Sequence, residues 1–180
     1  MRIQAWTEQT FGPDLPSLGC ALSSVDECPF SAPTTANITR KEKVMNIRKF
    51  QRADRRSLIE LWNTVFPDDP PHNEPSIVIQ AKLAVDDLIF VVEREGELVG
   101  ACMAGYDGHR GWLYAVAVSS DCRRLGVGKL LVEAAMSRLR DLGCIKVNLQ
   151  IRPTNKEVVS FYKSLGFAVE ERVSMGSFIE

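Results

Sequence analysis

The pattern of hydrophobic and polar residues changes near residue 45. Residues 1–44 hold four of the nine prolines and many serines and threonines, and they show no sustained period of 2 or 3.6. We expect this segment to be a mostly disordered leader. One hypothesis is that it is an appended or over-called extension, because Met45 opens a stretch that resembles a natural protein start. The periodic remainder, residues 45–180, is expected to form a single domain.

Alternating or continuous apolar runs predict the strands. In chain order they are expected at residues 46–50, 88–93, 98–106, 112–119 and 145–151, with a further strand from Phe167 and a final segment at 174–179. The run at 112–119 is apolar on both of its faces, which is typical of a strand in the centre of a sheet.

Apolar residues at a period of 3.6 predict four helices. The first carries Leu58, Leu61, Trp62, Val65 and Phe66 on one face and is ended by the proline-rich segment 67–75. The others are expected at residues 76–84, between a glycine loop and Gly143, and between a cap at Thr154 or Asn155 and Gly166. The order βααβββαβαββ predicts an α/β (α+β) fold in which a mixed sheet is covered by helices.

Charge and cysteine usage narrow the classes of partner. With 22 basic and 23 acidic residues the formal net charge is −1, so no basic field holds a nucleic acid or an anionic membrane. We expect no membrane span and no signal peptide, because no apolar run approaches the required length. The five cysteines form no Cys-x-x-Cys pair, which favours a reducing, cytoplasmic setting without a metal site. Cys102 and Cys144 are expected to pack as small hydrophobes, and Cys122 to be a solvated bystander.

One loop carries a pattern with chemical meaning. The stretch Arg-Arg-Leu-Gly-Val-Gly at 123–128 lies between the apolar strand and a helix. A helix N-terminus offers unpaired N–H groups and a partial positive charge, and glycines let the backbone approach phosphate oxygens, so the loop is a candidate anion site. Arg123 and Leu130 exclude a P-loop, and Leu131 excludes a dinucleotide-binding fingerprint. The alternative is a flexible turn whose arginines are only solvated.

A second motif strengthens the anion-site interpretation. Asn155, which follows Gly128 by 27 residues, opens the pattern Asn-x6-Tyr-x3-Gly-Phe. With the Arg-x-x-Gly-x-Gly loop before it, the region 45–180 resembles the GNAT superfamily of acyl-CoA-dependent N-acetyltransferases. The stretch GYDGHRG at 105–111 is similar to the YpeA-type bacterial acetyltransferases.

The resemblance implies a binding site for acetyl-CoA as co-substrate. The residues that would hold its pyrophosphate are Arg123, Arg124, Leu125, Gly126, Val127, Gly128 and Lys129, with Asn155 as a further contact. In the mostly antiparallel sheet of this superfamily, the strand at 112–118 would splay from the strand at 145–151, and the pantetheine arm would lie in the gap. Val116, Ala117 and Val118 would line this gap and offer a backbone N–H to the developing oxyanion. Asn155 could equally be a plain helix cap.

The resemblance also suggests catalytic and substrate residues. Tyr162 stands where members of the superfamily use a tyrosine as general acid toward the departing thiolate, although a core tyrosine is the alternative. Relatives that acetylate ribosomal-protein N-termini carry a glutamate five residues before the motif asparagine, but this position is Gln150, which cannot take a proton. Glu74, Asp107, His109 and Gln150 are weak candidates for substrate contacts, and the first three each have a structural alternative as a solvated or turn residue.

These residues point to one main function and leave two others open. We expect an N-acetyltransferase that moves acetyl from acetyl-CoA to a primary amine by direct attack in a ternary complex. The acceptor is a small molecule or a protein N-terminus. The alternatives are a protein N-terminal or lysine acetyltransferase and a non-catalytic acyl-CoA-sensing module. A homodimer is a possible assembly, and no nucleic acid, membrane or metal is expected as a partner.

Overall fold

The computed structural model describes residues 44–179. In chain order its strands are β1 (Met45–Lys49), β2 (Ile89–Arg94), β3 (Glu97–Tyr106), β4 (Gly111–Val118) and β5 (Val147–Asn148). Its helices are α1 (Arg55–Val65), α2 (Pro75–Val85), α3 (Val127–Asp141) and α4 (Lys156–Ser164), with 3₁₀ turns η1 (Arg52–Asp54), η2 (Pro71–Asn73) and η3 (Ser120–Cys122). The predicted leader lies outside these residues except for Val44. Within residues 44–179, no helix is long and apolar enough to cross a membrane.

The strands form one sheet in the order β1-β2-β3-β4-β5. The first four pair antiparallel, and β5 pairs parallel with β4. Only two residue pairs join β4 to β5, Gly111 with Val147 and Trp112 with Asn148. Since β4 continues to Val118, most of β4 has no partner in β5. The predicted mixed, mostly antiparallel sheet is confirmed.

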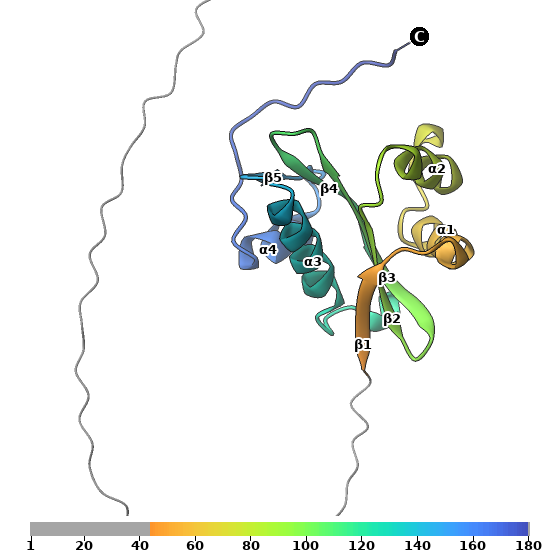
Figure 1. Ribbon diagram of the computed structural model, residues 1–180. Helices are drawn as coiled ribbons and strands as arrows, with labels where there is room; N and C mark the ends of the chain where they lie inside the picture. The colour runs from red at the N-terminus through yellow and green to blue at the C-terminus, as the bar shows by residue number, and fades with distance from the viewer. Residues whose placement is uncertain (1–43, 180) are drawn as a thin grey trace, which may run out of the picture. The chain divides into compact units, whose positions relative to one another are not determined.

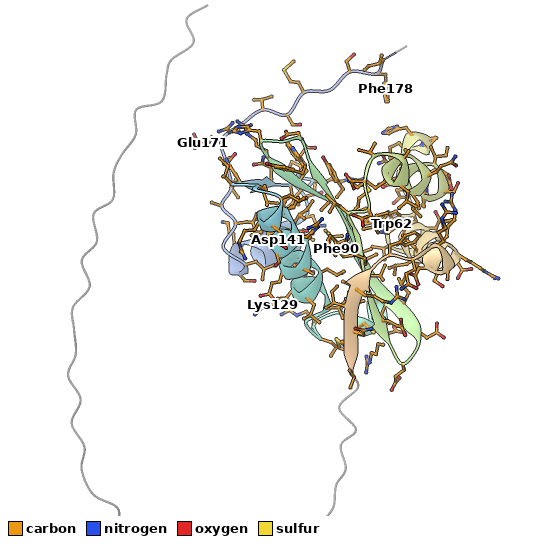
Figure 2. The ribbon with its side chains drawn as sticks, viewed as in Figure 1. Trp62, Phe90, Lys129, Asp141, Glu171 and Phe178 are labelled. Atoms are coloured by element: carbon orange, nitrogen blue, oxygen red, sulfur yellow. The ribbon has the colours of Figure 1, made fainter. Side chains whose placement is uncertain are left out.

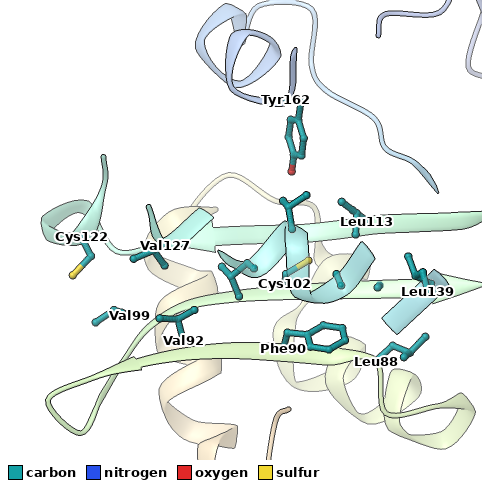
Figure 3. Packing of buried hydrophobic residues seen from close by; sticks show 14 residues of the cluster. Leu88, Phe90, Val92, Val99, Cys102, Leu113, Cys122, Val127, Leu139 and Tyr162 are labelled. Carbon is teal, nitrogen blue, oxygen red and sulfur yellow. The ribbon is translucent and has the colours of Figure 1, made fainter. Parts of the chain in front are cut away.

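Helices cover both faces of the sheet. Figure 1 shows α1 and α2 against one face, and α3 with α4 beside it against the other. Neighbouring residues of β2 point to opposite faces: Phe90 and Val92 pack under α3, whereas Ile89 and Val91 pack under α1. This is why the first four residues of β2 are all apolar. Figure 3 shows the core on the α3 side, which consists of Leu88, Phe90, Val92, Val99, Cys102, Ala104, Leu113, Cys122, Val127, Leu131, Val132, Ala135, Leu139 and Tyr162.

The C-terminal segment differs from the sequence prediction. Residues 167–179 contain no strand, so the last two strands of the predicted order are not formed. Side chains connect this segment to the region around β5: Lys146 pairs with Glu170, and Gln150 Nε2 donates to Ser174 Oγ at 2.6 Å. A strand, however, needs a partner for its backbone, and the apolar alternation that predicted these strands does not provide one.

An ion cluster fixes the entry to α1 against the edge of the sheet. Arg48 of β1 donates two hydrogen bonds to Asp54, at 2.7 and 2.9 Å, and two to Glu93 of β2, at 2.9 and 3.3 Å. The backbone N–H of Gln51 also donates to Asp54, at 2.7 Å. The hydrogen bond from Arg48 is the main cause of a lowered pKa at Asp54. Because Asp54 ends η1 immediately before α1, the cluster sets where that helix begins.

We predict that Asp54→Asn destabilises the fold at neutral pH by about 1–3 kcal/mol, because hydrogen bonds to a charged group are lost. A lowered folded-state pKa contributes stability that is present above about pH 4 and disappears as pH falls through that folded-state pKa. The difference between wild type and variant in urea unfolding should therefore shrink toward about pH 2. Asp87→Asn is the control, since its more exposed pair with Lys49 should contribute less than about 1 kcal/mol. An equal loss for Asp54→Asn at both pH values would contradict the prediction.

Candidate active site

The glycine loop places a row of free backbone donors at the start of α3. Arg124 has φ 62° and Gly126 has φ 88°, so the chain twice enters the left-handed region before the helix begins at Val127. No N–H of residues 124–129 makes a well-formed hydrogen bond to another group of residues 44–179. These donors add to the partial positive charge at the N-terminus of a 15-residue helix. The loop can therefore hold a multiply charged anion.

The charged side chains of the loop are exposed. Within the described part of the chain, Arg123 and Arg124 form no ion pair. Lys129 lies 3.8 Å from Glu133, one turn further along α3. The guanidinium groups of Arg123 and Arg124 can therefore turn toward a phosphate without first breaking a salt bridge. Cys122, directly before them, is a correction to the sequence prediction: it is buried, with Nη1 of Arg94 3.5 Å from its sulfur, and is not a solvated thiol.

Close packing brings three elements together at this loop. A Cβ on Gly128 would lie 3.2 Å from Phe161 of α4 and 3.8 Å from Val118 at the end of β4. A Cβ on Gly100 of β3 would lie 2.6 Å from Val127. Both positions need glycine because of space, since neither has a positive φ. The end of β4, the start of α3 and α4 consequently meet at one point.

A β-bulge interrupts β4 where it has already left β5. Ala101 pairs with Ala117 but Met103 pairs with Tyr114, so β4 has one extra residue. Ala115 in this bulge has φ 46°, a conformation unusual for a residue other than glycine. Trp62 of α1, which is 3% exposed, donates from Nε1 to the Ala115 carbonyl at 3.0 Å. Figure 2 shows Trp62 between α1 and the sheet. The bulge is thus held by a tertiary bond, and it sets the orientation of residues 116–118.

Tyr162 projects from α4 toward the sheet, with its hydroxyl foremost (Figure 3). It is 7% exposed, and its ring meets those of Phe161 and Phe167 edge-on at centroid distances of 5.0 and 5.4 Å. Burial, with a smaller effect from Cys102, raises its pKa. Burial also raises the pKa of the Cys102 thiol, to about 12. Both groups therefore stay protonated at neutral pH, so Tyr162 can donate a hydrogen bond.

Four predicted site residues hold structural contacts in this fold. Asn155 Oδ1 accepts from the N–H of Val158 at 3.3 Å and caps α4. Glu74 caps α2 by accepting two backbone N–H bonds, which with the Ser76 hydroxyl lower its pKa. Asp107 accepts the N–H groups of the two residues that precede Gly111, at 2.7 and 2.5 Å, which lowers its pKa in the turn before β4. Gln150 donates to Ser174, as described above.

The predicted site residues fall into two groups in space. The loop residues 123–129, the end of β4 at 116–118 and α4 with Tyr162 come together on the α3 side of the sheet. Glu74, Asp107 and the exposed His109 lie on turns elsewhere, with no contact to the loop among the described residues. No three His, Cys, Asp or Glu side chains within residues 44–179 are arranged to hold a metal ion. The Trp62 contact was missed, although a tryptophan on a buried helix face needs an acceptor for its N–H.

We predict that Trp62→Phe lowers the free energy of unfolding by about 2–4 kcal/mol, because it leaves a cavity and an unpaired Ala115 carbonyl. It should also shift the backbone amide resonances of residues 115–118. Leu139→Ala, a cavity in the core on the α3 side, is the control and should destabilise the fold without moving those resonances. Unchanged resonances at 115–118 in Trp62→Phe would show that the indole does not hold the bulge.

Comparison with known proteins places the chain in a family. Residues 55–167 match the acetyltransferase (GNAT) family. An acetyltransferase of Sodalis glossinidius (strain morsitans) is 39% identical over 130 residues, which is 72% of this chain and 91% of the relative. An acetyltransferase of Pectobacterium atrosepticum is 36% identical over 133 residues, covering 73% and 94%.

Solved structures share the fold. The aminoglycoside N-acetyltransferase AAC(6')-Iy in complex with CoA has a TM-score of 0.66 at 20% identity, covering 78% of this chain and 99% of that one. Ard1 from Thermoplasma volcanium has a TM-score of 0.63 at 24% identity, covering 70% and 84%. The chain therefore belongs to the acetyltransferase (GNAT) family and is an N-acetyltransferase.

Proposed function

We propose that the protein transfers acetyl from acetyl-CoA to a primary amine by direct attack in a ternary complex. The observation that carries this proposal is the row of free N–H donors at residues 124–129, placed beside the point where β4 has parted from β5. The N-terminus of α3 can bind phosphate, and the edge of β4 beside it has no strand partner. Together they fit a long ligand that has a pyrophosphate at one end and an extended amide chain behind it. The solved complex of AAC(6')-Iy with CoA supports the choice of acetyl-CoA as co-substrate.

The pyrophosphate would be bound by the backbone of the loop. The N–H groups of Arg124 through Lys129 make no well-formed hydrogen bond within residues 44–179, and a Cβ on Gly126 would meet nothing within 4 Å. Arg123 and Arg124 would add charge-assisted hydrogen bonds to phosphate oxygens, and Lys129 would do so if it leaves Glu133. Leu125, which is 48% exposed, and the buried Val127 would shape the wall of the site.

The pantetheine arm would pair with the free edge of β4. Val116, Ala117 and Val118 follow the bulge and have no β5 partner. A backbone N–H of this stretch would bind the thioester oxygen and stabilise the negative charge that develops on it. The left-handed Ala115 and its bond to Trp62 would keep this donor in place before substrate arrives.

In the chemical step, the lone pair of the neutral amine attacks the thioester carbon. The C–N bond forms, the C–S bond breaks, and the electron pair leaves with the sulfur as thiolate. Tyr162 would donate its phenolic proton to that sulfur as general acid, and its raised pKa keeps the phenol protonated for this purpose. The nitrogen, positively charged once the C–N bond has formed, would release its extra proton to solvent, and the phenolate would regain a proton from solvent. Asn155 uses its carbonyl oxygen as a cap, which leaves its amide N–H₂ available as a contact to the co-substrate.

No side chain of the site is an evident base. Gln150 cannot accept a proton. The pKa of Glu74 is lowered by hydrogen bonds from the Ser76 hydroxyl and from backbone N–H groups, and that of Asp107 by backbone N–H bonds. We propose that the amine loses its proton to solvent before attack, so the rate should rise with pH as the free amine becomes available. Glu74, Asp107 and His109 remain proposed as weak contacts at the rim of the acceptor site.

Two alternative functions are retained. Acetylation of a protein N-terminus or lysine is the first alternative, but Gln150 departs from the glutamate expected for the ribosomal-protein enzymes. A non-catalytic acyl-CoA sensor would keep the loop and would not need Tyr162. The retained tyrosine, with a hydroxyl that faces the sheet, favours the enzyme (Figure 3).

The setting of the enzyme is also proposed. We keep residues 45–180 as the catalytic domain and 1–44 as a leader. The free thiols of Cys102, Cys122 and Cys144 fit a reducing, cytoplasmic compartment. A homodimer remains a possible assembly.

Titration calorimetry of the full chain should show saturable binding of acetyl-CoA and none of NAD. The double substitution Arg123→Ala with Arg124→Ala should weaken binding about tenfold or more, because two charge-assisted contacts are lost. Arg140→Ala, an exposed arginine near the far end of α3, is the matched control and should bind like wild type. Failure of the folded wild-type protein to bind acetyl-CoA would reject the proposed site.

Tyr162→Phe should lower kcat by about 10²-fold or more while the Kd of acetyl-CoA stays within about twofold, because a general acid acts only in the chemical step. Phe167→Leu, which alters the packing of the same ring, is the control for a purely structural effect. Because the pKa of Tyr162 is raised, the wild-type rate should show no falling limb from its ionisation up to about pH 10. An unchanged kcat in Tyr162→Phe would remove the tyrosine from the mechanism.

A further inference from the structure

Two aromatic side chains on β4 belong to neither core of the protein. Trp112 and Tyr114 are two positions apart, so they lie on the same face of the strand. Their ring centroids are 6.4 Å apart and their planes differ by 15°. Tyr114 is 43% exposed, and neither ring is part of the packed cluster on either side of the sheet. Such a pair is available to bind another flat apolar group.

These rings face the side of the sheet that carries α1 and α2. Leu113, between them in sequence, packs into the core on the α3 side, and the face with Trp112 and Tyr114 is the one that Lys82 of α2 approaches. The loop at 123–126 and α4, in contrast, lie with α3. An acceptor bound to Trp112 and Tyr114 would therefore approach β4 from the α2 side of the sheet, opposite to the glycine loop and α4.

Gly105 makes room for the ring of Tyr114. It pairs with Trp112 across the β3–β4 ladder. A Cβ at this position would lie 3.1 Å from Cε2 and 3.6 Å from the hydroxyl of Tyr114, and 3.9 Å from Nζ of Lys82. The φ of Gly105 is not positive, so the backbone would accept any residue. The requirement for glycine therefore comes from the position of the Tyr114 ring.

The charges around the rings favour an approaching ammonium group. Lys82 is paired with Asp86 at 2.8 Å and is only 11% exposed, so its positive charge is already compensated. Burial, followed by the negative charge of Asp107, raises the pKa of Tyr114. The phenol therefore stays neutral, and its hydroxyl makes no hydrogen bond to another group of the described residues. Ring faces beside a carboxylate attract a cation, and the free hydroxyl can accept one of its N–H groups.

The rings also stand at a useful distance from the proposed reaction centre. Tyr114 directly precedes the bulge at Ala115, and Val116 follows it. At about 3.3 Å per residue, residue 116 is about 7 Å along the strand from Tyr114. A ligand ring on Tyr114 and Trp112 could thus place an amine at the thioester if two or three carbons join the ring to the nitrogen.

We propose that Trp112 and Tyr114 form the acceptor-binding surface and that the acceptor is an arylalkylamine, a primary amine on a short chain attached to a flat apolar ring. This inference rests on the proposed acetyl transfer for its activity test, but not for its binding test. Gly105 is the specificity-determining position, because any side chain there displaces Tyr114.

The activity test compares phenethylamine with butylamine, whose ammonium groups have similar pKa values, and with glucosamine as a polar amine. Wild-type full-length protein should have a kcat/KM for phenethylamine about tenfold or more above the other two. Trp112→Leu and Gly105→Val should raise the KM for phenethylamine about tenfold and leave the Kd of acetyl-CoA unchanged. Tyr106→Leu, an aromatic residue of β3 that packs with the core on the α3 side, is the matched control and should keep the preference.

The binding test needs no turnover. Phenethylamine added to the full-length protein without CoA should shift the indole N–H resonance of Trp112, which is assigned by its loss in Trp112→Leu. Acetylation without a preference for the aryl amine would overturn this inference and leave the proposed function intact. A shift at Trp112 without acetylation would support the surface and contradict the proposed function. The absence of a shift at Trp112 would overturn the proposal that Trp112 and Tyr114 form the acceptor-binding surface.

Discussion

The hydrogen bond from Trp62 to the Ala115 carbonyl is the contact on which the proposed active site depends. It joins α1 to β4 at the one place where β4 carries an extra residue and a left-handed backbone. Without this bond the bulge would have an unpaired buried carbonyl in a strained conformation, and a regular ladder would be the more stable alternative. A regular ladder would turn residues 116–118 over, because a shift of one residue exchanges the two faces of a strand.

The same strand also separates the two substrates that we propose. Beyond Trp112 its outer edge is free of β5, which leaves backbone donors for an extended ligand. Its side chains before the bulge, Trp112 and Tyr114, face α2, while the loop at 123–128 and Tyr162 lie on the α3 side. Direct attack in a ternary complex requires two separate binding sites, because the amine must approach the thioester carbon while acetyl-CoA is still bound. The two faces of β4 provide such sites.

Much of the fold followed from the sequence, and the exceptions have physical reasons. Helix α2 was predicted at 76–84 and spans Pro75–Val85, because Pro75 marks its start clearly. The bulge could not be predicted, since β4 is apolar on both faces and has no polar alternation to reveal a change of register. The predicted strands after Phe167 are absent because alternation shows which residues can form a strand but does not supply the neighbouring one. At the site, the motif located the loop and Tyr162, and the predicted cap at Asn155 is confirmed by the hydrogen bond that it accepts from the Val158 N–H. The cap at Glu74 became evident only from its backbone contacts.

The central claim is that acetyl passes directly from the thioester to an amine while both substrates are bound. It is tested most directly by following free thiol, acetylated amine and the mass of the intact protein in one reaction of the full chain with acetyl-CoA and phenethylamine. The account predicts that thiol and amide appear in equal amounts, that both need the amine, and that the protein gains no acetyl group with acetyl-CoA alone. An acetylated protein that forms without the amine and then passes its acetyl group on would contradict direct attack.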